Sequence, residues 1–185
     1  MAEDIRAASK KVQDFIKGPD RYLKVPYDGP ELNPREYWHK IVLQNRIRFL
    51  WQALVIFVCT ILPSGEFKNR LLRSIGMNIG KDAFIAPLVF MDIEFPSLLT
   101  IGDGAVVGTM TKILTHEVTI KSVRLGKTVI GKQALVGAGS VIRCGVTIGE
   151  GAVVAMNSFV NRDVPPFMVV GGSPLQDIKK LDKLL

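Results

Sequence analysis

The sequence predicts a mainly β fold, a parallel β-helix in which three six-residue repeats form each coil of a triangular prism. The first observation is an aliphatic residue at six-residue intervals, found at Ile79, Ile85, Ile101, Val107, Ile113, Ile130, Val136, Ile142, Ile148, Val154 and Val160. The second is a small or β-branched residue four places later, found at Ala134, Ser140, Val146, Ala152, Ser158 and Val164. A helix repeats every 3.6 residues and an ordinary strand every two, so a period of six indicates neither alone.

The segments on either side of the repeats predict three parts. Residues 2–17 carry apolar side chains at helical spacing and end at Gly18-Pro19, which predicts a helix. Four prolines within 19–34 predict an extended connector, and a second helix is expected to begin near Pro34. The expected organisation is a helical extension over 1–74, the β-helix over 75–172 and a C-terminal helix over 173–185.

The second helix is expected to continue through residues 49–62, which are apolar on all sides and end at Pro63-Ser64-Gly65. A membrane-spanning helix needs about 20 apolar residues, and this run is shorter. Burial against the β-helix or a partner subunit and an anchor at a membrane surface are the main interpretations, and a membrane span stays open as the third.

The C-terminal segment resembles a short amphipathic helix in its pattern. Ser173 and Pro174 suit the N-cap and first helical positions. Apolar residues then recur at near-helical spacing, so that one face would carry Leu175, Ile178, Leu181 and Leu185. We expect this helix to close the prism.

Composition limits the partners. The chain has 185 residues, 48% of them hydrophobic, which suits one domain with a modest extension. A net charge of +7 indicates an anionic partner such as a lipid surface or a phosphate-bearing cofactor. Nucleic acid is a weaker candidate, because the sequence contains no basic run interleaved with aromatic residues. Two cysteines, Cys59 and Cys144, give no disulfide framework. The charged N-terminus lacks a secretory signal pattern, so a cytoplasmic location is expected, with possible membrane association.

The repeat is interrupted twice, over Met91–Thr100 and over the basic segment Thr119–Thr128. His116 lies where the second interruption begins, and an imidazole suits general base catalysis near neutral pH. From the residues alone, a hydrogen-bonded corner histidine explains this position equally well. Its neighbour Glu117 is expected to point to the opposite face of a strand. The other histidine, His39, is expected to be a partly exposed helical residue.

Several motifs together resemble the hexapeptide-repeat acyltransferases, over residues 75 to 180. They are Ile101-Gly102-Asp103-Gly104-Ala105-Val106-Val107-Gly108, Ile113-Leu114-Thr115-His116-Glu117, Val136-Gly137-Ala138-Gly139-Ser140-Val141-Ile142, Asn161-Arg162-Asp163-Val164-Pro165-Pro166 and Gly171-Gly172-Ser173-Pro174. The similarity is greatest to the branch of maltose, galactoside and xenobiotic O-acetyltransferases. It implies a left-handed coil, a homotrimer and active sites between subunits.

The resemblance also implies an activity and a set of residues. It makes His116 the general base for transfer of an acetyl group from acetyl-CoA to a hydroxyl of a sugar-like acceptor, without a metal. Asp92 and Glu117 are the expected acceptor-binding residues, although Asp92 is explained equally well as a loop aspartate that accepts local backbone hydrogen bonds. The expected coenzyme A contacts are Ala138, Met156, Asn161, Arg162 and Lys179. Arg162 and Lys179 have the alternative of being solvated surface charges.

Two other functions remain as alternatives. A carbonic anhydrase of the γ type shares the prism fold but needs three imidazoles on zinc, and this chain has two histidines. A noncatalytic or membrane-docked trimeric scaffold would use the apolar segment 49–62.

Overall fold

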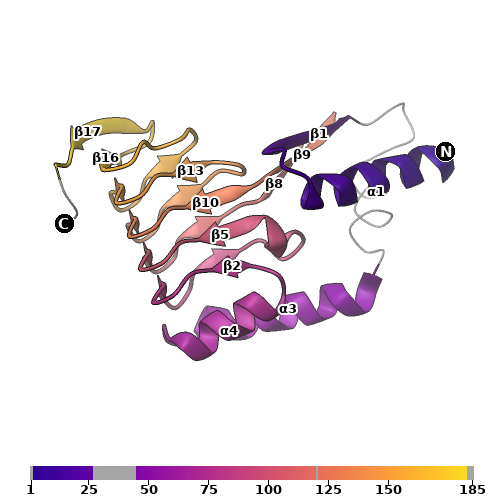
Figure 1. The fold of residues 1–185 in the computed structure, drawn as a ribbon, viewed down its shortest axis with the longest axis horizontal. Helices are drawn as coiled ribbons and strands as arrows, with labels where there is room; N and C mark the ends of the chain where they lie inside the picture. Colours follow the sequence, from indigo (N-terminus) through magenta and orange to yellow (C-terminus); the bar gives the residue numbers. More distant parts are fainter. Residues whose placement is uncertain (1, 27–44, 120, 183–185) are drawn as a thin grey trace.

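The computed structural model describes residues 2–26, 45–119 and 121–182, with side chains from residue 7 onward. Its main body is a prism of stacked coils with three faces, each a parallel sheet (Figure 1). The first face comprises β2 (Asn78–Ile79), β5 (Leu99–Ile101), β10 (Thr128–Ile130) and β13 (Thr147–Ile148). The second comprises β3 (Phe84–Ile85), β6 (Val106–Val107), β11 (Leu135–Val136), β14 (Val153–Val154) and β16 (Met168–Gly171). The third comprises β4 (Phe90–Met91), β7 (Lys112–Ile113), β12 (Val141–Ile142) and β15 (Phe159–Val160).

The aliphatic residues of the six-residue repeat form the interior of the prism. On the first face, Ile79, Ile101, Ile130 and Ile148 are aligned by parallel pairing, and all are buried. Equivalent columns on the other faces belong to the same core cluster. Complete burial of such a side chain contributes about 1.5–3 kcal/mol, so the stack is the main source of stability. The predicted β-helix periodicity is confirmed.

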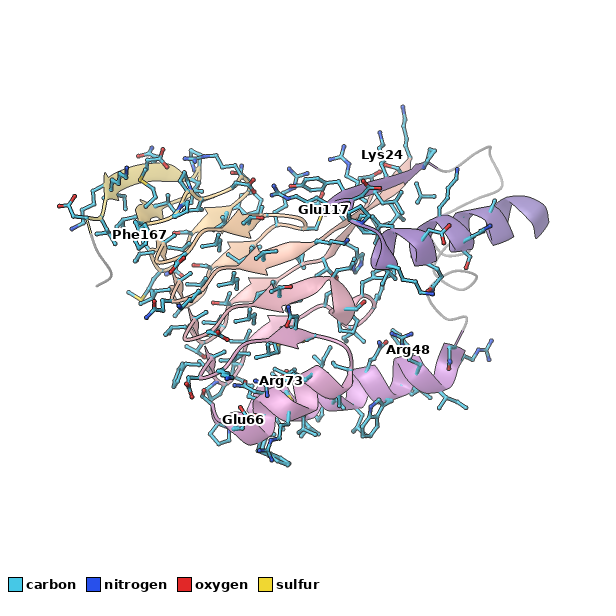
Figure 2. All side chains as sticks on the ribbon, viewed as in Figure 1. Lys24, Arg48, Glu66, Arg73, Glu117 and Phe167 are labelled. Atoms are coloured by element: carbon cyan, nitrogen blue, oxygen red, sulfur yellow. The ribbon has the colours of Figure 1, made fainter. Side chains whose placement is uncertain are left out.

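The helix α4 (Glu66–Ser74) covers the first coil, which has no coil beneath it. Carbonyl groups of this coil therefore need other donors, and three side chains of α4 supply them. Lys68 Nζ donates to the carbonyls of Ile85 and Ala86 at 3.0 and 2.9 Å, and Asn69 Nδ2 to that of Ala83 at 2.9 Å. Arg73, which Figure 2 shows beside Glu66 at this end, donates to the carbonyls of Ile79 and Gly80.

Replacing Lys68 with methionine is expected to lower the free energy of unfolding by about 2–4 kcal/mol, because several buried carbonyls lose a charged donor while the volume stays filled. Lys68 is only 1% exposed, so water does not readily replace the ammonium. Chemical denaturation measures the loss. Arg70→Met is the matched control, since the Arg70 side chain is 76% exposed. Equal stability of the two variants would contradict this role of Lys68.

The two interruptions of the repeat build a second, smaller unit beside the prism. The first contains the short 3-10 helix Pro96–Leu98, and the second forms an antiparallel hairpin of β8 (His116–Val118) and β9 (Ser122–Gly126). A basic loop was the expectation for the second interruption, and most of it is strand. The N-terminal β1 (Tyr22–Pro26) pairs with β9, which gives a three-stranded sheet in the order β1-β9-β8.

The predicted helix over residues 2–17 is confirmed as α1 (Ala2–Lys17). It packs on the three-stranded sheet through a cluster of seven buried residues, namely Val12, Phe15, Val25, Phe95, Leu98, Val123 and Leu125. Figure 1 shows α1 and this sheet projecting from one side of the prism. The predicted start of a helix near Pro34, and His39, lie outside the described residues.

The predicted C-terminal helix over 173–185 is wrong where the structure describes it. Residues Gln176–Lys180 form β17, which pairs antiparallel with β16 of the last coil. Without β17, β16 would leave one edge unpaired, and an unpaired edge favours addition of a strand. A five-residue segment gains little from an isolated helical turn, whereas pairing satisfies its backbone at once. Leu175 and Leu181 are buried at its two ends.

Candidate active site

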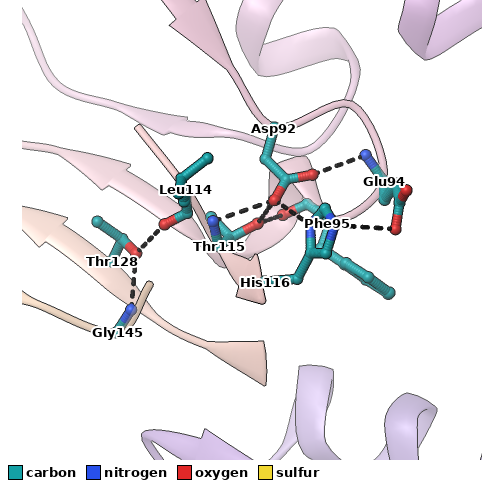
Figure 3. A network of polar contacts seen from close by, with 8 residues as sticks. All are labelled: Asp92, Glu94, Phe95, Leu114, Thr115, His116, Thr128 and Gly145. Atoms are coloured by element: carbon teal, nitrogen blue, oxygen red, sulfur yellow. Dashed lines mark hydrogen bonds and ion pairs between the residues drawn. The ribbon is translucent and has the colours of Figure 1, made fainter. Parts of the chain in front are cut away.

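His116 is the first residue of β8, just after the coil leaves the third face of the prism. Thr128 ties this exit to neighbouring coils, because its hydroxyl donates to the carbonyl of Leu114 at 2.6 Å and accepts from the amide of Gly145 at 2.9 Å (Figure 3). Thr128 is fully buried. The backbone just before the histidine is therefore tied to the coil that follows it.

The imidazole of His116 is held by a buried carboxylate. Its Nδ1 lies 2.5 Å from Oδ2 of Asp92, and the side chains of His116 and Asp92 are 22% and 2% exposed (Figure 3). The same oxygen accepts from the amide and the hydroxyl of Thr115 at 3.0 and 2.7 Å. Asp92 Oδ1 accepts from the amide of Glu94 at 2.9 Å. Because an ionised carboxylate only accepts, Nδ1 carries the proton and Nε2 of the neutral ring is left with a lone pair.

The other side of the ring faces a second carboxylate and an aromatic residue. Glu94 Oε2 lies 3.4 Å from His116 Nε2, and the Glu94 side chain is 13% exposed. The ring of Phe95 contacts the imidazole edge to face, with centroids 5.8 Å apart. Both residues belong to the first interruption, so the two breaks in the repeat meet at His116.

The surroundings of His116 and Asp92 set the charge states of these two side chains. Burial lowers the pKa of His116, but the hydrogen bond to Asp92 and the negative charges of Asp92, Glu94 and Glu117 outweigh it, so the pKa lies above its ordinary value of 6.5. Burial raises the pKa of Asp92, but the hydrogen bonds from His116 and Thr115 outweigh it and hold the pKa below 3.8. Asp92 therefore stays ionised while His116 exchanges a proton at Nε2.

Replacing Asp92 with asparagine is expected to lower the pKa of His116, because burial then acts without its opposing charge. Proton NMR titration of the ring measures the shift, and the acid limb of the kcat/KM profile should move to lower pH with it. The acid limb moves in this direction because His116 acts as a base only in its neutral form. A lower pKa keeps the imidazole neutral down to a lower pH. Asp177→Asn is the control, since Asp177 pairs with Arg162 on the surface. An unchanged His116 titration in Asp92→Asn would contradict the coupling.

Glu117 points away from His116, as the alternation of side chains along a strand predicts. Its carboxylate forms a bidentate ion pair with Arg143, at 2.6 Å to Nε and 2.9 Å to Nη2. Both line a cavity of about 360 Å³ on the other side of the three-stranded sheet, together with Tyr22, Lys24, Arg124 and Asn161. Figure 2 shows Lys24 and Glu117 on this sheet. Glu117 and Asp92 therefore lie on opposite sides of the hairpin.

The residues expected to contact coenzyme A lie along two corners of the prism and on the last strand. Ala138 and Met156 occupy adjacent coils of the corner between the second and third faces, where the amide of Asn157 donates to the carbonyl of Ala138 at 2.9 Å. Asn161 and Arg162 follow β15 at the corner from which His116 also emerges. Lys179 is exposed on β17. Arg162 pairs with Asp177 at 2.9 Å, and the two side chains are 45% and 53% exposed.

Three functional candidates were missed from the sequence. Glu94 follows Asp92 by two residues, which places both carboxylates in one short loop, and this spacing was an available signal. Arg143 and Thr115 carry no such signal, because their partners come from other coils. Within residues 2–26, 45–119 and 121–182, no three His, Cys, Asp or Glu side chains form a group that could hold a metal ion.

The stacked coils define a hexapeptide-repeat prism, and a buried carboxylate holds His116 where the chain leaves it. A family model described as a hexapeptide repeat of succinyl-transferase matches residues 127–162. "Putative acetyltransferase YvoF" of Bacillus subtilis (strain 168) is 35% identical over 150 residues, which cover 80% of this chain and 87% of that protein. The chain belongs to the hexapeptide-repeat acetyltransferase family.

Solved structures share the fold. A hexapeptide-repeat acetyltransferase from Vibrio cholerae O1 biovar eltor, in complex with acetyl coenzyme A, superimposes with a TM-score of 0.65 at 23% identity, covering 94% of this chain and 99% of that chain. A galactoside acetyltransferase in complex with coenzyme A gives 0.60 at 19% identity, over 74% of this chain and 82% of that one.

Proposed function

We propose that this chain is an O-acetyltransferase that moves an acetyl group from acetyl-CoA to a hydroxyl of a sugar or similar small acceptor. The observation that carries the proposal is the pair of His116 and Asp92 at a break in the prism. Such a pair fixes the tautomer and stabilises the imidazolium that forms during transfer. The relatives that bind acetyl-CoA or coenzyme A support the choice of donor.

The reaction follows from the geometry of the ring. His116 Nε2 takes the proton of the acceptor hydroxyl while its oxygen attacks the thioester carbonyl carbon. The tetrahedral intermediate collapses, the carbon–sulfur bond breaks, and the imidazolium returns the proton to the thiolate. The products are the acetyl ester and free coenzyme A. Asp92 orients the ring from Nδ1, and Glu94, on the Nε2 side, is placed to accept a hydrogen bond from a second hydroxyl of the acceptor.

In the proposed function the coil is left-handed and the chain is a homotrimer with active sites between subunits, and the outer surfaces of the prism support the association. The second face exposes Phe84 and Leu135, and the third exposes Phe90 and Phe159. Large exposed apolar side chains on the faces of the prism favour association of subunits. Between parallel prisms, the corner of Ala138 and Met156 would form one wall of a groove for the pantetheine arm. Arg162 and Lys179 would lie toward the phosphates. Light scattering should give three times the mass of the chain.

Release of the coenzyme A thiol from acetyl-CoA tests the proposed function across a panel of acceptors. The panel contains maltose, galactosides, chloramphenicol, an amino sugar and a deoxygenated sugar as the negative control. Mass spectrometry should show one added acetyl group on a hydroxyl. Acetylation of the amine alone would refute O-transfer, and no thiol release with any acceptor by a correctly assembled protein would count against the activity.

A further inference from the structure

The helix α3 (Arg46–Ile61) lies across the base of the prism (Figure 1). It carries apolar residues on two sides. Its inner side buries Gln52, Val55, Ile56 and Cys59, and three of these belong to the prism core. This confirms, for one side, the predicted burial of the segment against the β-helix. The helix has a second apolar side, and this side faces away from the prism.

The outer face of α3 consists of six large apolar residues that are 50–83% exposed, namely Ile47, Leu50, Trp51, Leu54, Phe57 and Ile61. At 100° per residue they span an arc of about 120° along the whole helix. Phe67 at the start of α4, the next helix along the chain, is also a large exposed apolar residue, at 68%. Scattered single apolar residues are ordinary on a protein surface, but a continuous stripe of this size marks a binding surface.

We propose that the outer face of α3 docks this protein on the surface of an anionic lipid bilayer, with the helix in the plane of the membrane. None of the described helices is long and apolar enough to cross a membrane, which leaves binding at the interface as the mode for this segment. Docking by an in-plane helix buries one apolar face to the depth of the headgroups. The width of the outer face matches that mode better than the narrow seam of a coiled coil.

Charge and aromatic content favour a bilayer over a second copy of the chain. α3 contains no acidic residue and has Arg46 and Arg48 at its N-terminal end. The carboxylate of Glu66 is engaged by Arg73 at 2.7 Å and by Arg70 at 3.4 Å, so this end of the prism is cationic overall. Basic residues beside an apolar face attract anionic headgroups, and tryptophan is enriched at the membrane interface. The net charge of +7 acts in the same direction.

Association in the proposed trimer would strengthen docking. Parallel prisms place the same end of every subunit on one side, so three copies of α3 would meet a single bilayer. Attachment of one helix then raises the effective concentration of the other two. This consequence depends on the trimer, whereas docking of α3 itself does not.

Flotation with vesicles of equal parts phosphatidylcholine and phosphatidylglycerol tests the proposal, with the full chain and without acetyl-CoA. The wild type is expected to float, and Leu50→Gln, Leu54→Gln and Phe57→Gln combined should weaken binding at least about tenfold. Ile178→Gln, at the opposite end of the prism and 59% exposed, is the matched control and should bind like the wild type. Arg46→Gln should reduce the preference for anionic over neutral vesicles about fivefold.

Trp51 supplies a second readout. With Trp38 replaced by phenylalanine, Trp51 is the single tryptophan, and its emission should shift to the blue as vesicles are added. Absence of wild-type flotation, or equal flotation by the triple variant, would overturn the proposal. If the wild type does not bind vesicles and the triple variant loses subunit association, the outer face of α3 is instead a contact between copies of the chain. Thiol release with a soluble acceptor should be unchanged in the triple variant, so failure of docking leaves the proposed activity intact.

Discussion

Replacing His116 with alanine is expected to lower kcat for acetyl transfer by about 10²–10⁴, because the transition state loses its general base. The KM for acetyl-CoA should change little, since the His116 ring contacts Asp92, Glu94 and Phe95, which are not among the residues expected to bind the donor. Thiol release under saturating acetyl-CoA measures the effect. Residual turnover above the background rate is expected, because binding alone still aligns the two substrates.

Two controls separate loss of the base from loss of structure. The His116→Ala variant should keep the subunit association and thermal stability of the wild type within a modest margin, since the ring is partly exposed and its removal empties no core position. Phe95 contacts one edge of the ring, so Phe95→Leu tests whether packing alone matters. Full turnover in a correctly assembled His116→Ala variant would show that His116 is not the general base.

The prism could be predicted because one position of each six-residue repeat always places its side chain in the interior of the coil. Ile101, Ile130 and Ile142 are fully buried, and a side chain that must fill the axis of a coil tolerates little besides an aliphatic group. The signal is therefore local and repeats with every strand. His116 was singled out for a related reason, since it lies where that regular signal stops, and its role as general base stays a prediction.

Elements that depend on distant partners could not be predicted in the same way. The spacing of Leu175, Ile178 and Leu181 is compatible with a helix, and only the free edge of β16 makes the segment a strand. The sheet β1-β9-β8 depends on pairing between segments almost 100 residues apart in the sequence.

In the candidate site, too, local features could be predicted from the sequence and contacts between coils could not. Asp92 was expected near the acceptor or in local backbone hydrogen bonds, and the structure shows it accepting one local bond, from the amide of Glu94, while also holding His116. Its 2% side-chain exposure favours a role in positioning the ring over direct acceptor contact. Glu117 was expected to bind the acceptor, and its pairing with Arg143 could not be inferred because Arg143 belongs to the next coil. Which groups meet across coils depends on register, which the six-residue period alone does not fix.

Replacing Gly137 with alanine is expected to lower the free energy of unfolding by more than about 4 kcal/mol, because the added methyl group meets backbone and not flexible side chains. An ideal Cβ at this position lies 2.5 Å from the amide nitrogen of Met156 and 2.8 Å from both the carbonyl carbon of Ala155 and the carbonyl oxygen of Val154. Two adjacent coils would have to separate, which also breaks the hydrogen bond between the amide of Gly137 and the carbonyl of Val154.

Gly65→Ala is the matched control, since no atom lies within 4 Å of its ideal Cβ, and it should cost less than about 1 kcal/mol. Thermal and chemical denaturation of both variants measure the difference. Because Gly137 directly precedes Ala138, whatever fraction of the variant folds should also bind acetyl-CoA more weakly, whereas two equally stable variants would show that the coils can separate at little cost.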